Sequence, residues 1–347
     1  MKTLALFLVL FSPGIEAILK SRSAKPAIIE KPINVTYNAM KMHEALKITN
    51  EAMIIRILCD KTSTQRMQIK DKYRELYNKD LTEVLNAKLW SDTQYLINSL
   101  LLDKDWYITR WVRGLLGRPH VQGLLEILST RNAEELNVIK YKYYQMYYEH
   151  LQYHPHRENM KDEELFVTYI VQQTRSDIVN STLAINDVEM LMNKGNTRDR
   201  WTTFIDIFTS RSFEQLKIIF DLYFQHTATK IEDTIRDKFS KVETRTEKQL
   251  KESRIKAVHE VLLDIVTMAY NPAAFYVDCI RRTMKGLFTG NNDLTYFLVT
   301  RAELDLHSIR EEWDVIEEES LYDWIIDDTS GYFREALLAI LEGNRYD

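Results

Sequence analysis

Apolar positions along the chain recur four times in one fixed register. The register is anchored by four basic residues: Lys61, Arg131, Arg211 and Arg301. Each anchor is followed by isoleucine at position eight, an aromatic residue at position twelve and an aliphatic residue at position twenty. Apolar residues also stand seven, four and three positions before each anchor. This pattern indicates one structural unit copied four times, because such units stack to bury apolar faces that none can bury alone.

The spacing within each unit is helical. Leu294, Phe297 and Leu298 in the fourth unit follow the i, i+3, i+4 spacing of one helix face. The chain has only 9 glycines and 6 prolines, which favours long uninterrupted helices over β structure. We therefore predict an all-α fold with about five short helices in each unit and no strands.

Successive anchors lie 70, 80 and 90 residues apart, which fits a unit of about 70 residues with insertions. The predicted division is a signal peptide at 1–17, a leader at 18–37, and repeats at 38–103, 104–174, 187–269 and 270–345. The polar insertion at 173–186 is typical of a linker. The insertion at 240–256 mixes charges of both signs, so we expect a solvated loop or a helix extension.

The N-terminus has the form of a secretory signal peptide. Lys2 precedes an apolar stretch from Leu4 to Phe11, and Ala17 is a small residue suited to cleavage. The alternative is a buried or membrane-anchoring helix, but the apolar run is too short to span a bilayer. The sequons at Asn34 and Asn180 add weak support for secretion and glycosylation.

Composition and motifs exclude several other classes. The net charge of −5, with no strongly basic block, argues against nucleic-acid binding, which needs a positive face. No P-loop, nucleophile elbow or dinucleotide fingerprint is present, so we predict no enzyme. The two cysteines, Cys59 and Cys279, do not make a disulfide scaffold, although a single bridge between them would suit secretion.

The fourth unit resembles the last repeat of annexins. The residues that carry the resemblance are Met284-Lys285-Gly286, Thr289, Thr300-Arg301 and Asp328-Thr329-Ser330-Gly331. The resemblance spans 38–345 and is weakest in the second unit. It implies an annexin-like disc of four five-helix repeats that binds acidic phospholipid through calcium on its convex face.

The resemblance also implies a calcium site in the fourth unit. Calcium takes six to eight oxygens, often backbone carbonyls with a bidentate carboxylate. Met284, Gly286 and Phe288 would supply carbonyls, and Asp328, which follows Met284 by 44 residues, the carboxylate, with Asp327 as a stand-in. Phe288 replaces a glycine of the family motif, at a cost of about 1–3 kcal/mol if its φ is positive. The alternative is a metal-free helix cap at Asp328.

The corresponding sites of the other units are degenerate. The position equivalent to Asp328 in the four units, which we call the carboxylate column, contains Lys88, Glu158, Lys238 and Asp328. The methionine column contains Glu44, Gly114, Lys194 and Met284, and the glycine columns contain Leu46, Leu116, Asn196 and Gly286, then Ile48, Arg118, Arg198 and Phe288. A lysine offers only donors and repels a cation, so units one and three should not bind calcium in this way.

A second metal candidate is the histidine-rich segment of unit two. His150, His154, His156 and Glu158 have residue types that suit zinc. Pro155 places two of the histidines on a loop, so a surface loop without metal is the competing interpretation.

The sequence therefore predicts a secreted, peripheral membrane protein. Its expected activity is calcium-dependent binding to acidic phospholipid membranes, with most calcium sites degenerate. The competing hypothesis retains the scaffold as an extracellular protein-interaction module that binds neither calcium nor lipid.

Overall fold

The structure is a computed structural model of the chain. It describes residues 24–116, 122–151, 170, 175–193, 197–240, 248–285 and 290–346. These residues form helices and contain no strand, apart from an isolated bridge between Ser176 and Arg211. The predicted all-α fold is confirmed.

The helices follow one another in repeating groups. The first group comprises α3 (Val35–Lys47), α4 (Glu51–Leu58), α5 (Ser63–Tyr77), α6 (Leu81–Asn86) and α7 (Ser91–Leu100). The second includes α8 (Lys104–Leu116), α9 (Gln122–Ser129) and α10 (Ala133–Tyr147). The third comprises α12 (Ser181–Met192), α13 (Thr197–Ser210), α14 (Phe213–Thr227), α15 (Ile231–Ser240) and α16 (Lys248–Tyr270). The fourth comprises α17 (Pro272–Met284), α18 (Asn291–Arg301), α19 (Leu306–Ile316), α20 (Leu321–Asp328) and α21 (Gly331–Glu342).

The two predicted insertions contain more helix than a linker would. The second half of the segment 173–186 belongs to α12, because the Asn180 side chain caps this helix by accepting from the Leu183 N–H. The prediction of a linker over that half was wrong. Residues 248–256 form the first part of the 23-residue helix α16, so there the helix-extension alternative holds.

The anchor columns have a physical basis at helix starts. Thr62, Asn132 and Ser212 each follow an anchor directly, and each caps the next helix through its side chain. The isoleucines at position eight, Ile69, Ile139, Ile219 and Ile309, are all buried. The repeated pattern therefore corresponds to the start of a helix and to the buried side of that helix.

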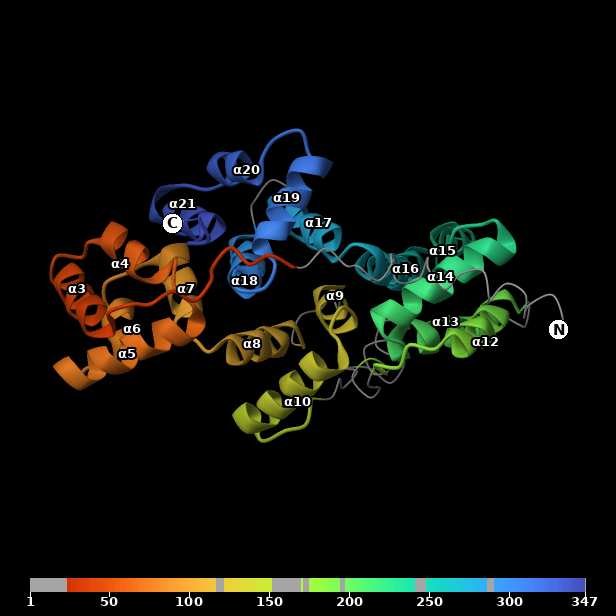
Figure 1. The fold of residues 1–347 in the computed structure, drawn as a ribbon, viewed down its shortest axis with the longest axis horizontal. Coiled ribbons are helices and arrows are strands. Elements are labelled where there is room, and N and C mark those ends of the chain that lie inside the picture. The colour runs from red at the N-terminus through yellow and green to blue at the C-terminus, as the bar shows by residue number, and fades with distance from the viewer. Residues whose placement is uncertain are drawn as a thin grey trace.

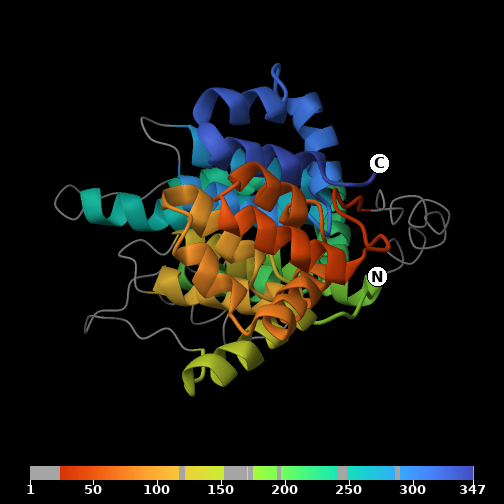
Figure 2. The same ribbon diagram turned by 90° about the vertical axis from the view of Figure 1, so that its left-hand side faces the viewer.

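The buried side chains form two cores. Helices α3–α7 of the first repeat share one core with α17–α21 of the last repeat. Helices of the second and third repeats share the other core, which Tyr296 of α18 joins. Figures 1 and 2 show the first and last repeats side by side, with α12–α16 toward the other end of the molecule.

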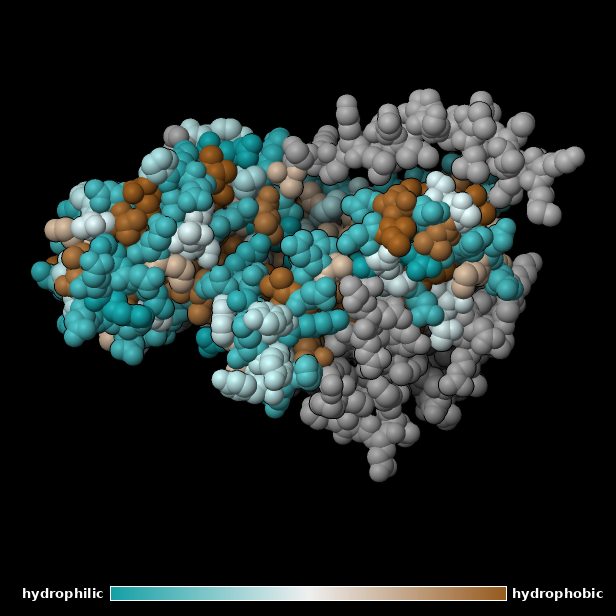
Figure 3. Space-filling view, turned by 60° about the horizontal axis from the view of Figure 1, so that its bottom comes forward, coloured by the Kyte–Doolittle hydropathy of each residue, from teal (hydrophilic) through white to brown (hydrophobic). Residues whose placement is uncertain are grey.

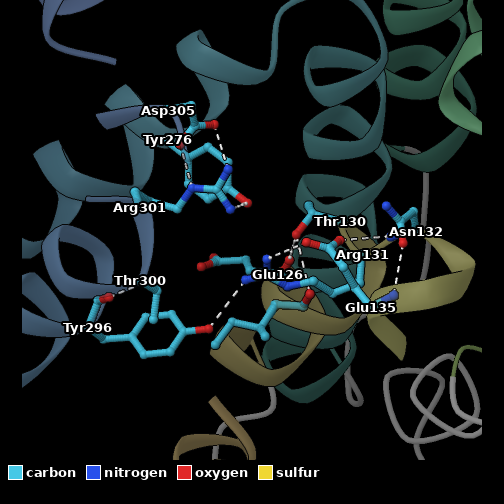
Figure 4. Close-up of polar contacts among 11 residues, drawn as sticks. Glu126, Thr130, Arg131, Asn132, Glu135, Tyr276, Tyr296, Thr300, Arg301 and Asp305 are labelled. Carbon is cyan, nitrogen blue, oxygen red and sulfur yellow. Dashed lines mark hydrogen bonds and ion pairs between the residues drawn. The ribbon is translucent and has the colours of Figure 1, made fainter. Parts of the chain in front are cut away.

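A polar seam lies between the two cores (Figure 4). The Arg131 guanidinium donates to the Tyr296 hydroxyl at 3.3 Å, across the boundary between repeats. Arg301 donates to the Tyr276 hydroxyl at 3.1 Å and pairs with Asp305. These buried guanidiniums therefore have hydrogen-bond partners that also fix the helices around them, although the Arg131 Nε makes no hydrogen bond with the described residues.

Both cysteines are free thiols in this fold. Cys59 and Cys279 are buried in the core of the first and last repeats. Burial raises the pKa of Cys59 to about 12, so its thiol stays neutral and unreactive at physiological pH. The bridge considered from the sequence is not formed.

Candidate calcium site

Four helices of the first and last repeats place their N-terminal ends on one edge. Helix α7 packs on α18 and α21, and α21 packs on α4. At their N-terminal ends, the Asn291 amide of α18 donates to the Asp92 carboxylate of α7 at 2.8 Å. Burial raises the pKa of Glu51, at the start of α4, and the Glu335 carboxylate of α21 raises it further.

The opposite ends of these helices also meet one another. The Glu303 carboxylate lies just after α18. It accepts a hydrogen bond at 2.7 Å from the N–H of Ser63, the first residue of α5, which follows α4. Ser99 and Leu100 at the end of α7 line a cleft with Thr300 of α18. The loops that precede the four helices therefore share one side of the molecule. We call this side the loop edge and define it by residues 48–50, 87–90, 290 and 329–330.

The predicted methionine position lies at the end of a helix beside the loop edge. Helix α17 ends at Met284, and the Gly290 N–H returns to the Thr283 carbonyl at 2.7 Å. The last carbonyls of a helix have no partner within it, so they are suited to a cation. Gly286 and Phe288, the two intervening ligand positions, lie outside the described residues.

The predicted carboxylate lies close to the same helix end. Asp328 is the last residue of α20, and it is exposed, as is Asp327. The Lys285 ammonium lies 6.0 Å from the Trp324 ring centroid, and Trp324 is one helical turn before Asp328. Gly331 follows with φ of +60°, a turn conformation that a Cβ would disfavour.

The residues of the fourth repeat fit a calcium ion in donor type. They combine an exposed carboxylate with the carbonyl end of a helix and a tight return of the chain, and calcium accepts such oxygens. The helix-cap alternative receives no support from α21. This helix begins after Ser330, whose own side chain makes no cap hydrogen bond.

The equivalent positions in the other repeats differ. Glu44 pairs with Lys41 at 2.8 Å, and Lys88 lies in the loop before α7. Gly114 lies within α8, and Lys238 lies within α15. The remaining predicted positions of these columns include Arg118, Glu158, Lys194 and Asn196, which lie outside the described residues.

The histidine-rich segment is described only in part. His150 stacks on Tyr144 with ring centroids 5.0 Å apart, whereas His154, His156 and Glu158 lie outside the described residues. Within the part of the chain that the structure describes, no three His, Cys, Asp or Glu side chains cluster as metal ligands would. The zinc hypothesis stays a prediction.

The loop edge also contains two apolar residues whose exposure the sequence pattern did not predict. Trp90 is 74% exposed and Ile48 is 75% exposed. Trp90 stands two positions after the carboxylate column, where the fourth repeat has Ser330. Comparing that column across repeats would have drawn attention to it.

Known proteins show which family shares this architecture. The family model described as Annexin matches residues 37–100 and 276–340. Mouse annexin A13 is 31% identical over 332 residues, covering 92% of this chain and 99% of that protein. The solved structure of annexin III superposes with a TM-score of 0.80 at 26% identity, covering 93% of this chain and 98% of that one. The calcium-bound structure of annexin (Sm)1 has a TM-score of 0.75 at 22% identity, covering 93% and 94%.

A four-repeat helical disc with calcium-type loops at its edge defines a class of peripheral membrane proteins. This chain belongs to the annexin family. Calcium is the ligand of that family, and its members in general bind phospholipid in a calcium-dependent way without enzymatic activity. Among the described helices, none is both long and apolar enough to cross a bilayer.

Proposed function

We propose that the chain binds acidic phospholipid membranes through calcium held in its fourth repeat. Met284, Gly286 and Phe288 supply backbone carbonyls, and Asp328 supplies the carboxylate. The other repeats contribute the scaffold and little calcium binding. Lipid phosphates complete the coordination of the ion, which takes more oxygens than the protein offers.

One observation carries this proposal. Asp328 is exposed at the end of α20, beside the helix end formed by Met284 and Lys285. Calcium bridging is also the natural route for this chain, since its net charge of −5 gives no general attraction to anionic lipid.

The competing function is a protein-interaction module that has lost calcium and lipid binding. Lys88 and Lys238 in the carboxylate column favour that function for the first and third repeats. On the face shown in Figure 3, apolar residues form small separate patches among polar ones, with no broad apolar surface among the described residues. The fourth-repeat geometry therefore supports membrane binding better.

Calorimetry of calcium binding tests the proposed site. We expect heat from the wild-type protein and none from Asp328→Ala, because the substitution removes the only side-chain ligand of the proposed site. Asp314→Ala is the matched control, an exposed aspartate on α19 away from the loops. Equal heats from wild type and Asp328→Ala would refute the assignment.

Secretion is a separate part of the proposal. Residues 1–17 lie outside the described residues, so support comes from their sequence pattern. Asn34 and Asn180 are both exposed at helix starts. Expression in a secreting eukaryotic cell should yield medium-borne protein that lacks residues 1–17, and full-length protein retained in the cytosol would contradict it.

A further inference from the structure

We propose that the first repeat binds anionic membranes directly, without calcium, by inserting Trp90 and Ile48 into the bilayer surface. This inference rests on the proposed function for the orientation of the loop edge toward the membrane. It assigns a positive role to a repeat whose calcium ligands are replaced.

Exposure of these two side chains is the first observation. Trp90 is 74% exposed in the loop between α6 and α7, and Ile48 is 75% exposed in the loop between α3 and α4. Trp90 has extended backbone, with φ of −135° and ψ of 156°, so no backbone constraint explains a tryptophan there. Single exposed apolar side chains are common on soluble proteins, so it is the shared location of Trp90 and Ile48 on the loop edge that indicates a partner surface.

Location is the second observation. Both loops precede helices, α4 and α7, whose N-terminal ends lie on the loop edge with those of α18 and α21. Asp328 of the proposed calcium site directly precedes residues 329–330 of that edge, and Gly290 at the start of α18 belongs to it. A membrane bound to calcium at the fourth repeat would therefore also face Trp90 and Ile48.

Charge is the third observation. Lys47 is exposed next to Ile48, and Lys88 lies two residues before Trp90. The Asp92 carboxylate on this edge accepts a hydrogen bond from Asn291 at 2.8 Å. Each lysine near an anionic surface adds to the electrostatic attraction. The same lysine that excludes calcium from the first repeat therefore favours lipid phosphate.

The chemistry of the four residues matches the membrane interface. Tryptophan concentrates where the headgroups meet the acyl chains, because its ring is apolar and its N–H remains hydrated. Lysine side chains extend from such positions so that the ammonium reaches the phosphates. An anionic bilayer is the occupant that both the apolar pair and the lysines fit.

Tryptophan fluorescence provides the direct test. Full-length protein is mixed, in calcium chelator and low salt, with phosphatidylserine–phosphatidylcholine vesicles that contain brominated lipid. We expect quenching of the wild-type emission and loss of that quenching in Trp90→Phe, which preserves the aromatic ring. Equal quenching of both proteins, or no quenching of either, would overturn the proposal.

Binding measurements separate this inference from the calcium site. Trp90→Ala should weaken vesicle binding about tenfold, with and without calcium. Tyr148→Ala is the matched control, because Tyr148 is 85% exposed at the end of α10 in another repeat. Unchanged binding by Trp90→Ala would overturn the proposed insertion of Trp90 into the membrane but would not affect the proposed calcium site. Loss of the calcium effect in wild type, with chelator binding retained, would overturn only the calcium site.

Discussion

Single side chains distinguish the repeats of this annexin from one another. Asp328 and Lys88 occupy the same column, yet one attracts a cation and the other repels it. The surrounding apolar columns are retained, as the buried Ile69 and Ile309 show. Chemistry at the loop edge can therefore change while the scaffold persists.

Asp264 is a buried carboxyl whose charge should affect stability. It lies on α16 facing Arg282, whose Nη2 is 4.0 Å away, and its Oδ2 accepts no hydrogen bond from the described residues. Burial raises the pKa of Asp264 to about 7; Arg282 lowers it, whereas Glu126, Asp278 and Glu260 raise it. The folded state therefore holds a proton that the unfolded state releases near pH 4.

We predict that this carboxyl makes the protein less stable as pH rises. Between pH about 4 and about 7 the folded state binds more protons, so the free energy of unfolding falls by up to about 1.4 kcal/mol per pH unit. Asp264→Asn should flatten that part of the profile in urea denaturation. An identical slope in the variant would contradict the assignment.

Among the glycines that the structure describes, Gly343 is the one whose replacement should cost most. Its φ is +63°, and a Cβ there would lie 2.1 Å from the Ala27 carbonyl oxygen. Gly343→Ala should therefore destabilise by about 1–3 kcal/mol or more. Gly114→Ala is the control, because a Cβ there meets nothing within 4 Å and should stabilise α8 by up to about 1 kcal/mol. Thermal unfolding that ranks the two variants in the reverse order would refute the argument.

At the scale of helices, capping residues explain where elements begin. Thr62 and Gln65 form a reciprocal capping box at the start of α5. Ser330 occupies the same position before α21 but makes no side-chain cap bond. The starts of α5 and α21 can therefore be compared directly, because both helices contribute to the same core but only α5 has a side-chain cap bond from its N-cap residue.

We predict that Thr62→Ala costs about 1 kcal/mol of unfolding free energy, the typical value for a lost cap. Ser330→Ala should change stability little, since no cap bond is lost there. Urea denaturation of both variants measures the difference. Equal costs would show that the capping box at α5 contributes nothing of its own.

Helix content was predictable because periodicity and caps are local signals. Residues 181–186 were assigned to a linker because polar residues dominate the segment 173–186 as a whole. The buried Ala184 and Asp187 face the core only once the repeats pack. The proposed site at Met284 and Asp328 came from the resemblance to the annexin motif, in which the two positions are 44 residues apart, and it stays a prediction. Trp90 was not predicted to be functional, because exposure at a loop follows from packing and cannot be obtained from spacing.

At the scale of the whole molecule, hydrogen bonds made by segments near the two ends of the described chain connect the first and last repeats. The Ala27 N–H donates to the Ala302 carbonyl at 2.9 Å. The Asn344 amide donates to the Ile29 carbonyl at 2.9 Å and to the Asp60 carbonyl at 2.8 Å. These bonds, with the shared core, hold two repeats in fixed orientation. Their loops can therefore meet one flat membrane.

Vesicle sedimentation tests the central claim most directly. Wild-type protein should pellet with phosphatidylserine vesicles much more in millimolar calcium than in chelator, whereas Asp328→Ala should need at least about tenfold more calcium. Asp314→Ala should behave as wild type. A wild-type protein whose pelleting does not depend on calcium, or an Asp328→Ala variant with unchanged calcium dependence, would contradict the account.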